Sequence, residues 1–327
     1  MERRFSPPTS PWSARRADDA YGVSAKPDWR AVDWAAHLRQ VEIDGTRVNY
    51  VDLGSGEREP VVFVHGLGGQ WQNWLENLPR VAQERRALAL DLPGFGVSSE
   101  PREKVTIPWY GRCVEALCDR LDLGQVAIVG NSMGGFISAE VAIQFPSRVS
   151  RLVLVSAAGI SSTNVRRRPI LLGGRVVAAI LTNTIPRQRA IASRPTARHL
   201  SPLAFVARYP KLLRADLVYE GLFKGTGKPG FDDALRANLD YDFTDRLPEV
   251  KVPTLIVWGE NDSIIPSRDA NEFERLIPDS RKVVMRETGH IPMAERPQAF
   301  NDLLMDFVAE TGPAGEKEAV EGEAQVA

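Results

Sequence analysis

Cysteine, histidine and long apolar runs are all scarce in this chain. It has two cysteines and four histidines in 327 residues. Cys113 and Cys118 share one expected helix at a spacing that puts them on different faces, so they indicate neither a metal site nor a redox pair. No stretch approaches the roughly 18 apolar residues of a membrane span. The segment Met1–Pro8 lacks the apolar core of a secretory signal, and we therefore expect a cytoplasmic protein.

An excess of one charge is also missing overall. The chain has 41 Lys and Arg against 42 Asp and Glu, which implies no general attraction to nucleic acid. Residues 161–215 are the exception, because they contain no Asp or Glu. Their basic residues are Arg166, Arg167, Arg168, Arg175, Arg187, Arg189, Arg194, Arg198, Arg208, Lys211 and Arg214. Together with the apolar run Pro169–Leu181 they favour contact with an acyl substrate or an anionic lipid surface; a solvated basic face is the alternative.

One segment combines a buried strand, a sharp turn and a helix. The strand expected over Gln125–Val129 is apolar and β-branched, as in strands covered on both faces. Small and apolar residues at helical spacing follow from Gly134. Between strand and helix, Gly130-Asn131-Ser132-Met133-Gly134 has the pattern Gly-x-Ser-x-Gly, in which glycines allow a close approach of backbone around a strained turn. The pattern predicts that Ser132 is a nucleophile.

A serine nucleophile needs a base and an acid that orients the base. His290 lies in a loop directly after an expected strand, and so does Asp262. The chain order Ser132, acid, histidine is typical of one of the three known arrangements of this triad. We therefore predict that His290 is the base and Asp262 the acid. Glu260 and Glu287 are the alternative acids.

Four motifs together resemble the α/β-hydrolase superfamily, over residues 39–310. The motifs are His65-Gly66-Leu67-Gly68-Gly69, Asp91-Leu92-Pro93-Gly94-Phe95-Gly96, the serine turn, and the pair of segments Trp258–Pro266 and Gly289–His290. The resemblance implies an α/β-hydrolase fold, in which helices flank a mostly parallel central sheet and an inserted, mainly helical cap covers the active site.

The resemblance also implies an oxyanion hole made of backbone amides. The amides of Leu67 and Met133 would bind the negative charge that develops on a carbonyl oxygen, a contribution typically worth about 3 kcal/mol per donor. The supporting residues would be His65, Gly66, Gly130 and Gly134.

The order of the expected elements predicts one α/β core with an insertion. Alternating runs around Asp44-Gly45 predict a hairpin. Further strands are expected over Val61–Val64, Ala87–Leu92, Gln125–Val129, Val149–Val155, Pro253–Trp258 and Arg281–Met285. Helical stretches between most of them indicate a parallel sheet. We expect a partly disordered N-terminal extension over 1–38, the core over 39–160 and 246–310, the cap over 161–245, and an acidic disordered tail over 311–327.

Within this superfamily, the serine turn and the loop Gly66-Leu67-Gly68-Gly69 resemble those of bacterial lipases, monoacylglycerol-lipase-like enzymes and carboxylesterases. The resemblance implies a hydrolase of small-molecule carboxylic esters with a medium or long acyl chain, which needs no metal and no cofactor. Ser132 argues against epoxide hydrolases and haloalkane dehalogenases, which have aspartate at the turn. C–C bond hydrolases of aromatic degradation share the turn but usually have tryptophan where Ile291 stands, and they are the main alternative. Acyltransferase or haloperoxidase-like activity and a non-catalytic binding protein are further alternatives.

Overall fold

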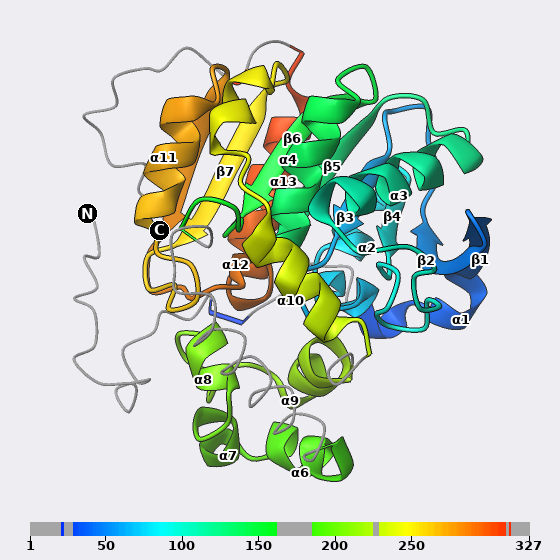
Figure 1. The fold of residues 1–327 in the computed structure, drawn as a ribbon. Helices are drawn as coiled ribbons and strands as arrows, with labels where there is room; N and C mark the ends of the chain where they lie inside the picture. The colour runs from blue at the N-terminus through cyan, green and yellow to red at the C-terminus, as the bar shows by residue number, and fades with distance from the viewer. Residues whose placement is uncertain (1–20, 23–28, 162–184, 225–228, 312–313, 315–327) are drawn as a thin grey trace.

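The centre of the molecule is an eight-stranded sheet with strand order β1-β2-β4-β3-β5-β6-β7-β8 (Figure 1). The computed structural model describes residues 21–22, 29–161, 185–224, 229–311 and 314. The strands are β1 (Leu38–Ile43), β2 (Thr46–Leu53), β3 (Val61–Val64), β4 (Ala87–Leu90), β5 (Val126–Asn131), β6 (Val149–Val155), β7 (Thr254–Gly259) and β8 (Ser280–Met285).

The first two strands form the predicted hairpin, and the remaining strands are parallel to one another. Ile43 pairs with Thr46 across a two-residue turn. Asp44 and Gly45 both have positive φ, 47° and 74°, as a turn matching the twist of the flanking strands requires. β2 pairs antiparallel with β4, whereas the pairs from β4 through β8 are all parallel. The parallel strands therefore end at one common edge.

Helices cover both faces of the sheet. The helices are α1 (Trp34–His37), α2 (Leu78–Val81), α3 (Ile107–Arg120), α4 (Met133–Gln144), α6 (Gln188–Ser193), α7 (Pro195–His199), α8 (Leu203–Val206), α9 (Ala215–Leu217), α10 (Phe231–Asp240), α11 (Arg268–Leu276), α12 (Pro292–Glu295) and α13 (Pro297–Ala309). Shorter 3-10 or π segments include η2 (Trp29–Ala31), η3 (Trp71–Trp74), η5 (Ile185–Arg187), η6 (Val218–Phe223) and η7 (Thr244–Glu249).

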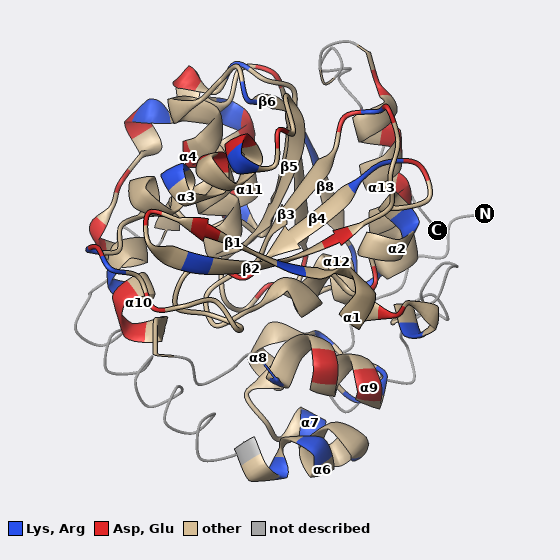
Figure 2. Cartoon of the chain, turned by 90° about the vertical axis from the view of Figure 1, so that its right-hand side faces the viewer, with Lys and Arg blue, Asp and Glu red and all other residues tan. Residues whose placement is uncertain are grey.

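Successive side chains of the central strands belong to two different hydrophobic cores. In β3, Val62 and Val64 pack in one core with α3, α4 and α11, while Val61 and Phe63 pack in the other with α2 and α13. Figure 2 shows these two helix layers on opposite sides of the sheet. Alternation of this kind follows from the two-residue period of a strand. Both layers are apolar, which explains why these strands read as continuous hydrophobic runs.

The insertion between β6 and β7 forms a separate helical layer. In Figures 1 and 2, α6, α7, α8 and α9 lie together at one end of the molecule. α10 leads from this layer back to the core, and the amide of Gly230 at its start donates to the carbonyl of Gly94, 3.2 Å away. The apolar run Pro169–Leu181 and four of the basic residues, Arg166, Arg167, Arg168 and Arg175, lie outside the described residues.

Several residues of the expected N-terminal extension and C-terminal tail are buried in the fold, among them Tyr21 and Ala314. The Tyr21 side chain is only 5% exposed and lies among the apolar residues of one core. Ala314 is buried as well, and its amide donates to Asp279 at 2.8 Å. These two residues depart from the disorder that composition predicts, because their contacts are with residues distant in the chain.

Candidate active site

Ser132 occupies the turn between β5 and α4 with a backbone that a non-glycine residue adopts only under strain. Its φ is 55° and its ψ is −121°, and such a conformation typically costs about 1–3 kcal/mol unless the surroundings enforce it. Its amide donates to Val155 at 2.9 Å, and its carbonyl accepts from Ala158 at 3.0 Å. The end of β6 and the loop that follows it thus hold the serine turn through both its amide and its carbonyl.

Gly130 and Gly134 have no room for a side chain. A Cβ at Gly130 would lie 2.2 Å from the carbonyl oxygen of Gly134, and one at Gly134 would lie 2.2 Å from the carbonyl oxygen of Val64. These distances are far inside van der Waals contact and involve backbone, which gives way only if the strands move. The supporting role predicted for both glycines therefore has a direct steric basis.

The loop after β3 lies against the serine turn. A Cβ at Gly66 would come within 3.0 Å of the Ser132 Cβ. Gly66 accepts a hydrogen bond from Gly69 at 3.0 Å, and Gly68 has a φ of 73°, which closes a tight turn around Leu67. The hydrogen bond that closes this turn runs from the amide of Gly69 to the carbonyl of Gly66 and does not involve the amide of Leu67. Met133 is the first residue of α4, where an amide has no acceptor within its own helix.

His290 and Asp262 are hydrogen-bonded to each other. His290 Nδ1 lies 2.8 Å from Asp262 Oδ2. The other carboxylate oxygen of Asp262 accepts from the amides of Ile264 at 2.8 Å and Ile265 at 2.9 Å, and the Asp262 side chain is fully buried. An ionised carboxylate only accepts, so Nδ1 of His290 donates and Nε2 of the neutral ring is left as an acceptor.

The alternative acids have other partners. Glu287 is hydrogen-bonded to the hydroxyl of Tyr209, and Glu260 accepts from the amide of Glu287 at 3.3 Å. Of the three candidate acids, Asp262 is thus the one that is hydrogen-bonded to the ring of His290.

His65 is buried and supports the loop after β3. Its Nε2 accepts from the amide of Leu92 at 3.0 Å, so Nδ1 carries the proton and donates to the carbonyl of Gly66 at 2.7 Å. Burial lowers the pKa of His65 from 6.5 to about 4. The ring is therefore neutral at physiological pH and holds Gly66 in place.

Asn131 and Glu295, which were not predicted from the sequence, connect the loops of the candidate site. Asn131 Nδ2 donates to the carbonyl of Val155 at 3.1 Å and to the carbonyl of His290 at 3.2 Å, which links the serine turn to the histidine loop. The carboxylate of Glu295 accepts from Gly289 at 2.9 and 3.0 Å and from Ile291 at 3.3 Å. The only sequence signal for either residue is a polar side chain within an apolar element.

The basic residues of the insertion do not form one continuous charged face. Arg198 is buried, and its guanidinium donates to the carbonyls of Pro210, Ala192 and Lys211 within the insertion itself. Arg214 forms an ion pair with the buried Glu76. Among residues 186–215, Arg187, Arg189 and Arg194 are the exposed arginines. Figure 2 shows basic residues on α6 and α7, and acidic residues on α9 and the adjoining η6.

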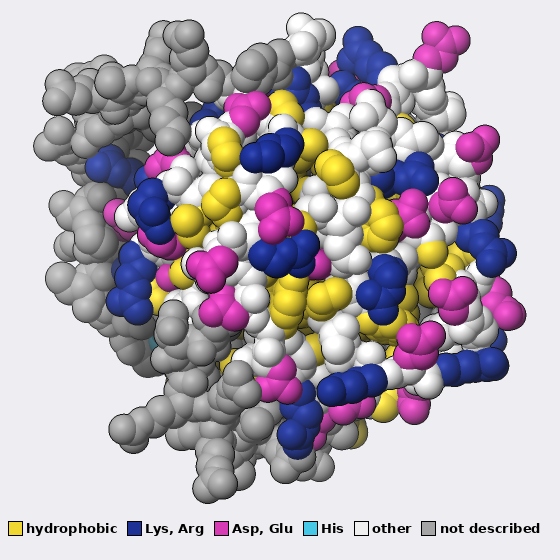
Figure 3. Space-filling model, turned by 45° about the horizontal axis from the view of Figure 1, so that its top comes forward, with side chains coloured by type: hydrophobic (Ala, Val, Ile, Leu, Met, Phe, Trp, Pro, Cys, Tyr) yellow, Lys and Arg dark blue, Asp and Glu magenta, His cyan; other side chains and the backbone are white. Residues whose placement is uncertain are grey.

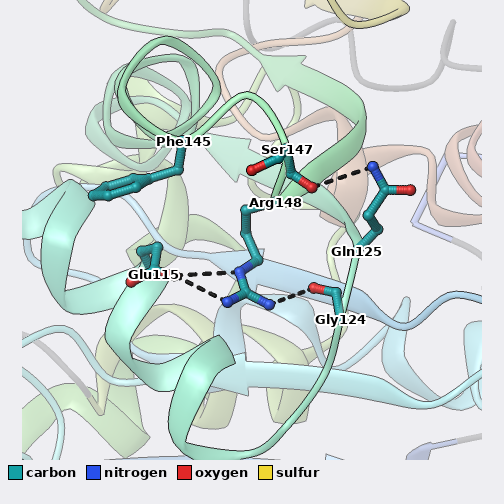
Figure 4. Close-up of a pocket in the computed structure, with 6 residues that line it drawn as sticks. All are labelled: Glu115, Gly124, Gln125, Phe145, Ser147 and Arg148. Atoms are coloured by element: carbon teal, nitrogen blue, oxygen red, sulfur yellow. Dashed lines mark hydrogen bonds and ion pairs between the residues drawn. The ribbon is translucent and has the colours of Figure 1, made fainter.

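A surface hollow lies away from these residues, and the two charged side chains that line it are paired with each other. It is lined by Glu115, Gly124, Gln125, Phe145, Ser147 and Arg148 (Figure 4). The guanidinium of Arg148 is hydrogen-bonded to Glu115 at 3.0 and 3.3 Å and to the carbonyl of Gly124. The charge in this hollow therefore joins α3 to the loop before β6. On the face that Figure 3 shows, acidic and basic side chains alternate with small apolar spots.

Comparison with known proteins places the chain in a family. A family model for the alpha/beta hydrolase fold matches residues 59–297. The chain therefore belongs to the alpha/beta hydrolase family of enzymes, and the fold expected from the motifs is confirmed. None of the helices in the described ranges is both long and apolar enough to cross a bilayer.

Relatives within this family differ in their reactions. The chain is 32% identical over 277 residues to the dihydrolipoyllysine-residue acetyltransferase component of the acetoin cleaving system of Pseudomonas putida, an alignment covering 83% of this chain and 69% of that protein. It is 30% identical over 290 residues to the 2-hydroxy-6-oxo-2,4-heptadienoate hydrolase of Pseudomonas putida, covering 83% and 96%. The enol-lactonase structure from Burkholderia xenovorans superimposes with a TM-score of 0.69 at 23% identity, covering 83% and 100%.

Proposed function

We propose that this hydrolase cleaves carboxylic esters through an acyl-enzyme formed on Ser132. The observation that carries the proposal is the hydrogen bond of 2.8 Å between His290 and the buried Asp262. A histidine held in this way has the tautomer and orientation of a general base. Asn131 ties the loop of that histidine to the strained turn of Ser132.

The reaction uses these groups in sequence. Nε2 of His290 takes the proton of the Ser132 hydroxyl as the oxygen attacks the ester carbonyl. The amides of Leu67 and Met133 stabilise the resulting oxyanion. The imidazolium, paired with Asp262, returns its proton to the departing alcohol. A water molecule then repeats these steps on the acyl-enzyme and releases the carboxylic acid.

The surroundings of the oxyanion loop support an apolar acyl group. The ring of Phe231, at the start of α10, lies against Gly68, since a Cβ there would be 3.3 Å from it. An apolar wall at this place favours substrates with hydrocarbon next to the carbonyl, by about 0.8 kcal/mol for each methylene that it buries. We therefore propose esters with a medium or long acyl chain as the substrate class.

Hydrolysis of a C–C bond is the second candidate, because a named relative at 30% identity is a 2-hydroxy-6-oxo-2,4-heptadienoate hydrolase. The same Ser132, Asp262 and His290 would serve it. Ile291 after the histidine and the Leu67-Gly68-Gly69 loop favour the ester reaction. An acetyltransferase component is also among the relatives, and transfer to an acceptor other than water would pass through the same acyl-enzyme.

Labelling and turnover together test the proposal. A fluorophosphonate probe should label Ser132 in the wild type, and neither Ser132→Ala nor His290→Ala should be labelled. Turnover should be measured on p-nitrophenyl esters of increasing chain length, beside a 2-hydroxy-6-oxodienoate. We expect kcat to fall by about four to six powers of ten in each variant, because triad members act as a unit. Faster turnover of the dienoate than of every ester would favour C–C hydrolysis, and labelling of another residue would refute the proposal.

A further inference from the structure

Glu295 holds the backbone on both sides of His290. Its carboxylate accepts from the amide of Gly289 at 2.9 and 3.0 Å and from that of Ile291 at 3.3 Å. The side chain is fully buried, so water does not compete for these bonds. The position of the His290 ring therefore depends on how firmly the carboxylate is held.

Two further donors complete the surroundings of this carboxylate, and neither comes from the histidine loop. The amide of Arg208, in the insertion, donates to Glu295 at 2.7 Å. The hydroxyl of Tyr21 donates to the same oxygen at 2.5 Å. That hydroxyl also accepts from the amide of Tyr209 at 2.9 Å. One phenol thus connects the histidine loop to the insertion.

Tyr21 is well placed to act as a permanent donor. The rings of Tyr21 and Tyr209 meet edge to face, with centroids 5.3 Å apart. Burial and the charge of Glu295 raise the pKa of Tyr21 well above its ordinary value, so the phenol keeps its proton. Burial also raises the pKa of Glu295, and the hydrogen bonds that it accepts oppose this shift. Removing a donor would therefore weaken the ionised form that binds the loop.

Trp29 forms a second contact of similar design between the start of the chain and a buried carboxylate. Trp29 Nε1 donates to the buried Glu76 at 2.9 Å, and Arg214 of the insertion is paired with that same carboxylate. The Glu76 carboxylate is thus bonded to Trp29 and Arg214, neither of which belongs to the histidine loop. The Glu295 carboxylate, in contrast, is bonded directly to the backbone on both sides of His290.

We infer that Tyr21 is a positioning residue of the active site, which acts on His290 through Glu295. The family model matches residues 59–297, so Tyr21 lies outside the residues that the model covers. The inference rests on the proposed function, in which His290 is the general base. It makes Tyr21 a component of the catalytic apparatus.

The test compares Tyr21→Phe with Trp29→Phe in the full chain. Each substitution keeps an aromatic ring and removes one donor to a buried carboxylate. A misplaced catalytic group can reduce rates by about a hundredfold, and for Tyr21→Phe we expect kcat to fall about tenfold with KM within a factor of two. Trp29→Phe should lower the melting temperature and leave kcat unchanged. Glu295→Gln should lower kcat more than Tyr21→Phe. The side-chain NH2 of the glutamine would face the backbone amides and the Tyr21 hydroxyl, which are themselves donors.

A second readout needs no substrate. The Nδ1 proton of His290, bonded to Asp262, should give a downfield proton resonance in the wild type, which shifts or broadens in Tyr21→Phe but not in Trp29→Phe. Unchanged kcat and an unchanged resonance in Tyr21→Phe would overturn the inference, as would equal losses of kcat in the two variants. Failure of the wild type to react with fluorophosphonate would instead overturn the proposed function, while the resonance would still report on the contact between Tyr21 and the histidine loop.

Discussion

His290 and Asp262 lie 28 positions apart in the sequence, yet Nδ1 of the one is 2.8 Å from Oδ2 of the other. The sheet brings them together. β7 and β8 are parallel neighbours, and their last residues, Gly259 and Met285, are paired in register. The two loops that follow therefore start side by side at the same edge of the sheet.

Replacing the acid should disable the base without unfolding the protein. In Asp262→Asn we expect kcat to fall by about ten-thousand-fold at neutral pH, because the amide stabilises the wrong tautomer of His290. Glu260→Gln is the matched control and should retain most activity. Steady-state kinetics, with circular dichroism to verify the fold, would check this. A nearly neutral Asp262→Asn would show that another group orients the histidine.

His65 should make stability depend on pH in a defined window. Its pKa is about 4 in the folded protein against an ordinary 6.5, so the unfolded chain binds the proton more readily. The contribution of neutral, buried His65 to the free energy of unfolding is fully present above pH 6.5. It is lost as the pH falls towards 4, and the total loss is about 3 kcal/mol. Urea unfolding at intervals between pH 7 and 4 should show a smaller decline for His65→Gln than for the wild type. Identical declines would contradict this assignment.

Two glycines in helices should respond oppositely to alanine. Gly134→Ala places a Cβ 2.2 Å from the carbonyl oxygen of Val64, and overpacking of this kind typically costs about 1–3 kcal/mol or more. In Gly111→Ala in α3 the new Cβ would lie 3.3 Å from the end of the Gln144 side chain and at ordinary contact distances, 3.5 and 3.7 Å, from Glu140 and Val141. Alanine should therefore be neutral or stabilising by about 0.5–1 kcal/mol. Thermal unfolding of the two variants measures the difference. Equal melting temperatures would mean that the turn relaxes easily.

We also propose that the exposed arginines of the insertion attract anionic lipid. Sedimentation with phosphatidylserine vesicles should detect binding at low salt that weakens at physiological salt, since the screening length falls to about 8 Å there. The double variant Arg187→Gln and Arg194→Gln should bind less than a control with Arg112→Gln and Arg120→Gln on α3, which has the same net charge. Absence of binding by the wild type at low salt would leave the solvated basic face as the interpretation.

Much of the fold could be predicted because its signals are local. The Asp44-Gly45 turn demanded positive φ at two adjacent residues, and the hairpin formed there. The apolar runs of β3 and β6 were expected over the residues that form them. The ends of the other expected strands differ from the observed ends by one or two residues. β5, for example, extends to Asn131 because parallel pairing with Val155 continues the strand.

Charge and burial in the insertion could not be predicted in the same way. A count of basic residues treats Arg198 and Arg187 alike, yet Arg198 is buried among carbonyl groups and Arg187 faces solvent. The difference depends on where the carbonyls of Pro210 and Lys211 fall after the chain folds. No periodicity in the sequence encodes that position.

By itself, the sequence predicted the serine turn, because that turn needs Gly130 and Gly134 at fixed offsets and these are local steric requirements. It also determined the parallel core, since buried strands must be apolar along their whole length. Only the tertiary structure decided that Asp262, and not Glu260 or Glu287, orients His290. It alone joined Tyr21 to Glu295, 274 positions away, because a hydrogen bond between distant segments leaves no spacing in the sequence from which it can be read.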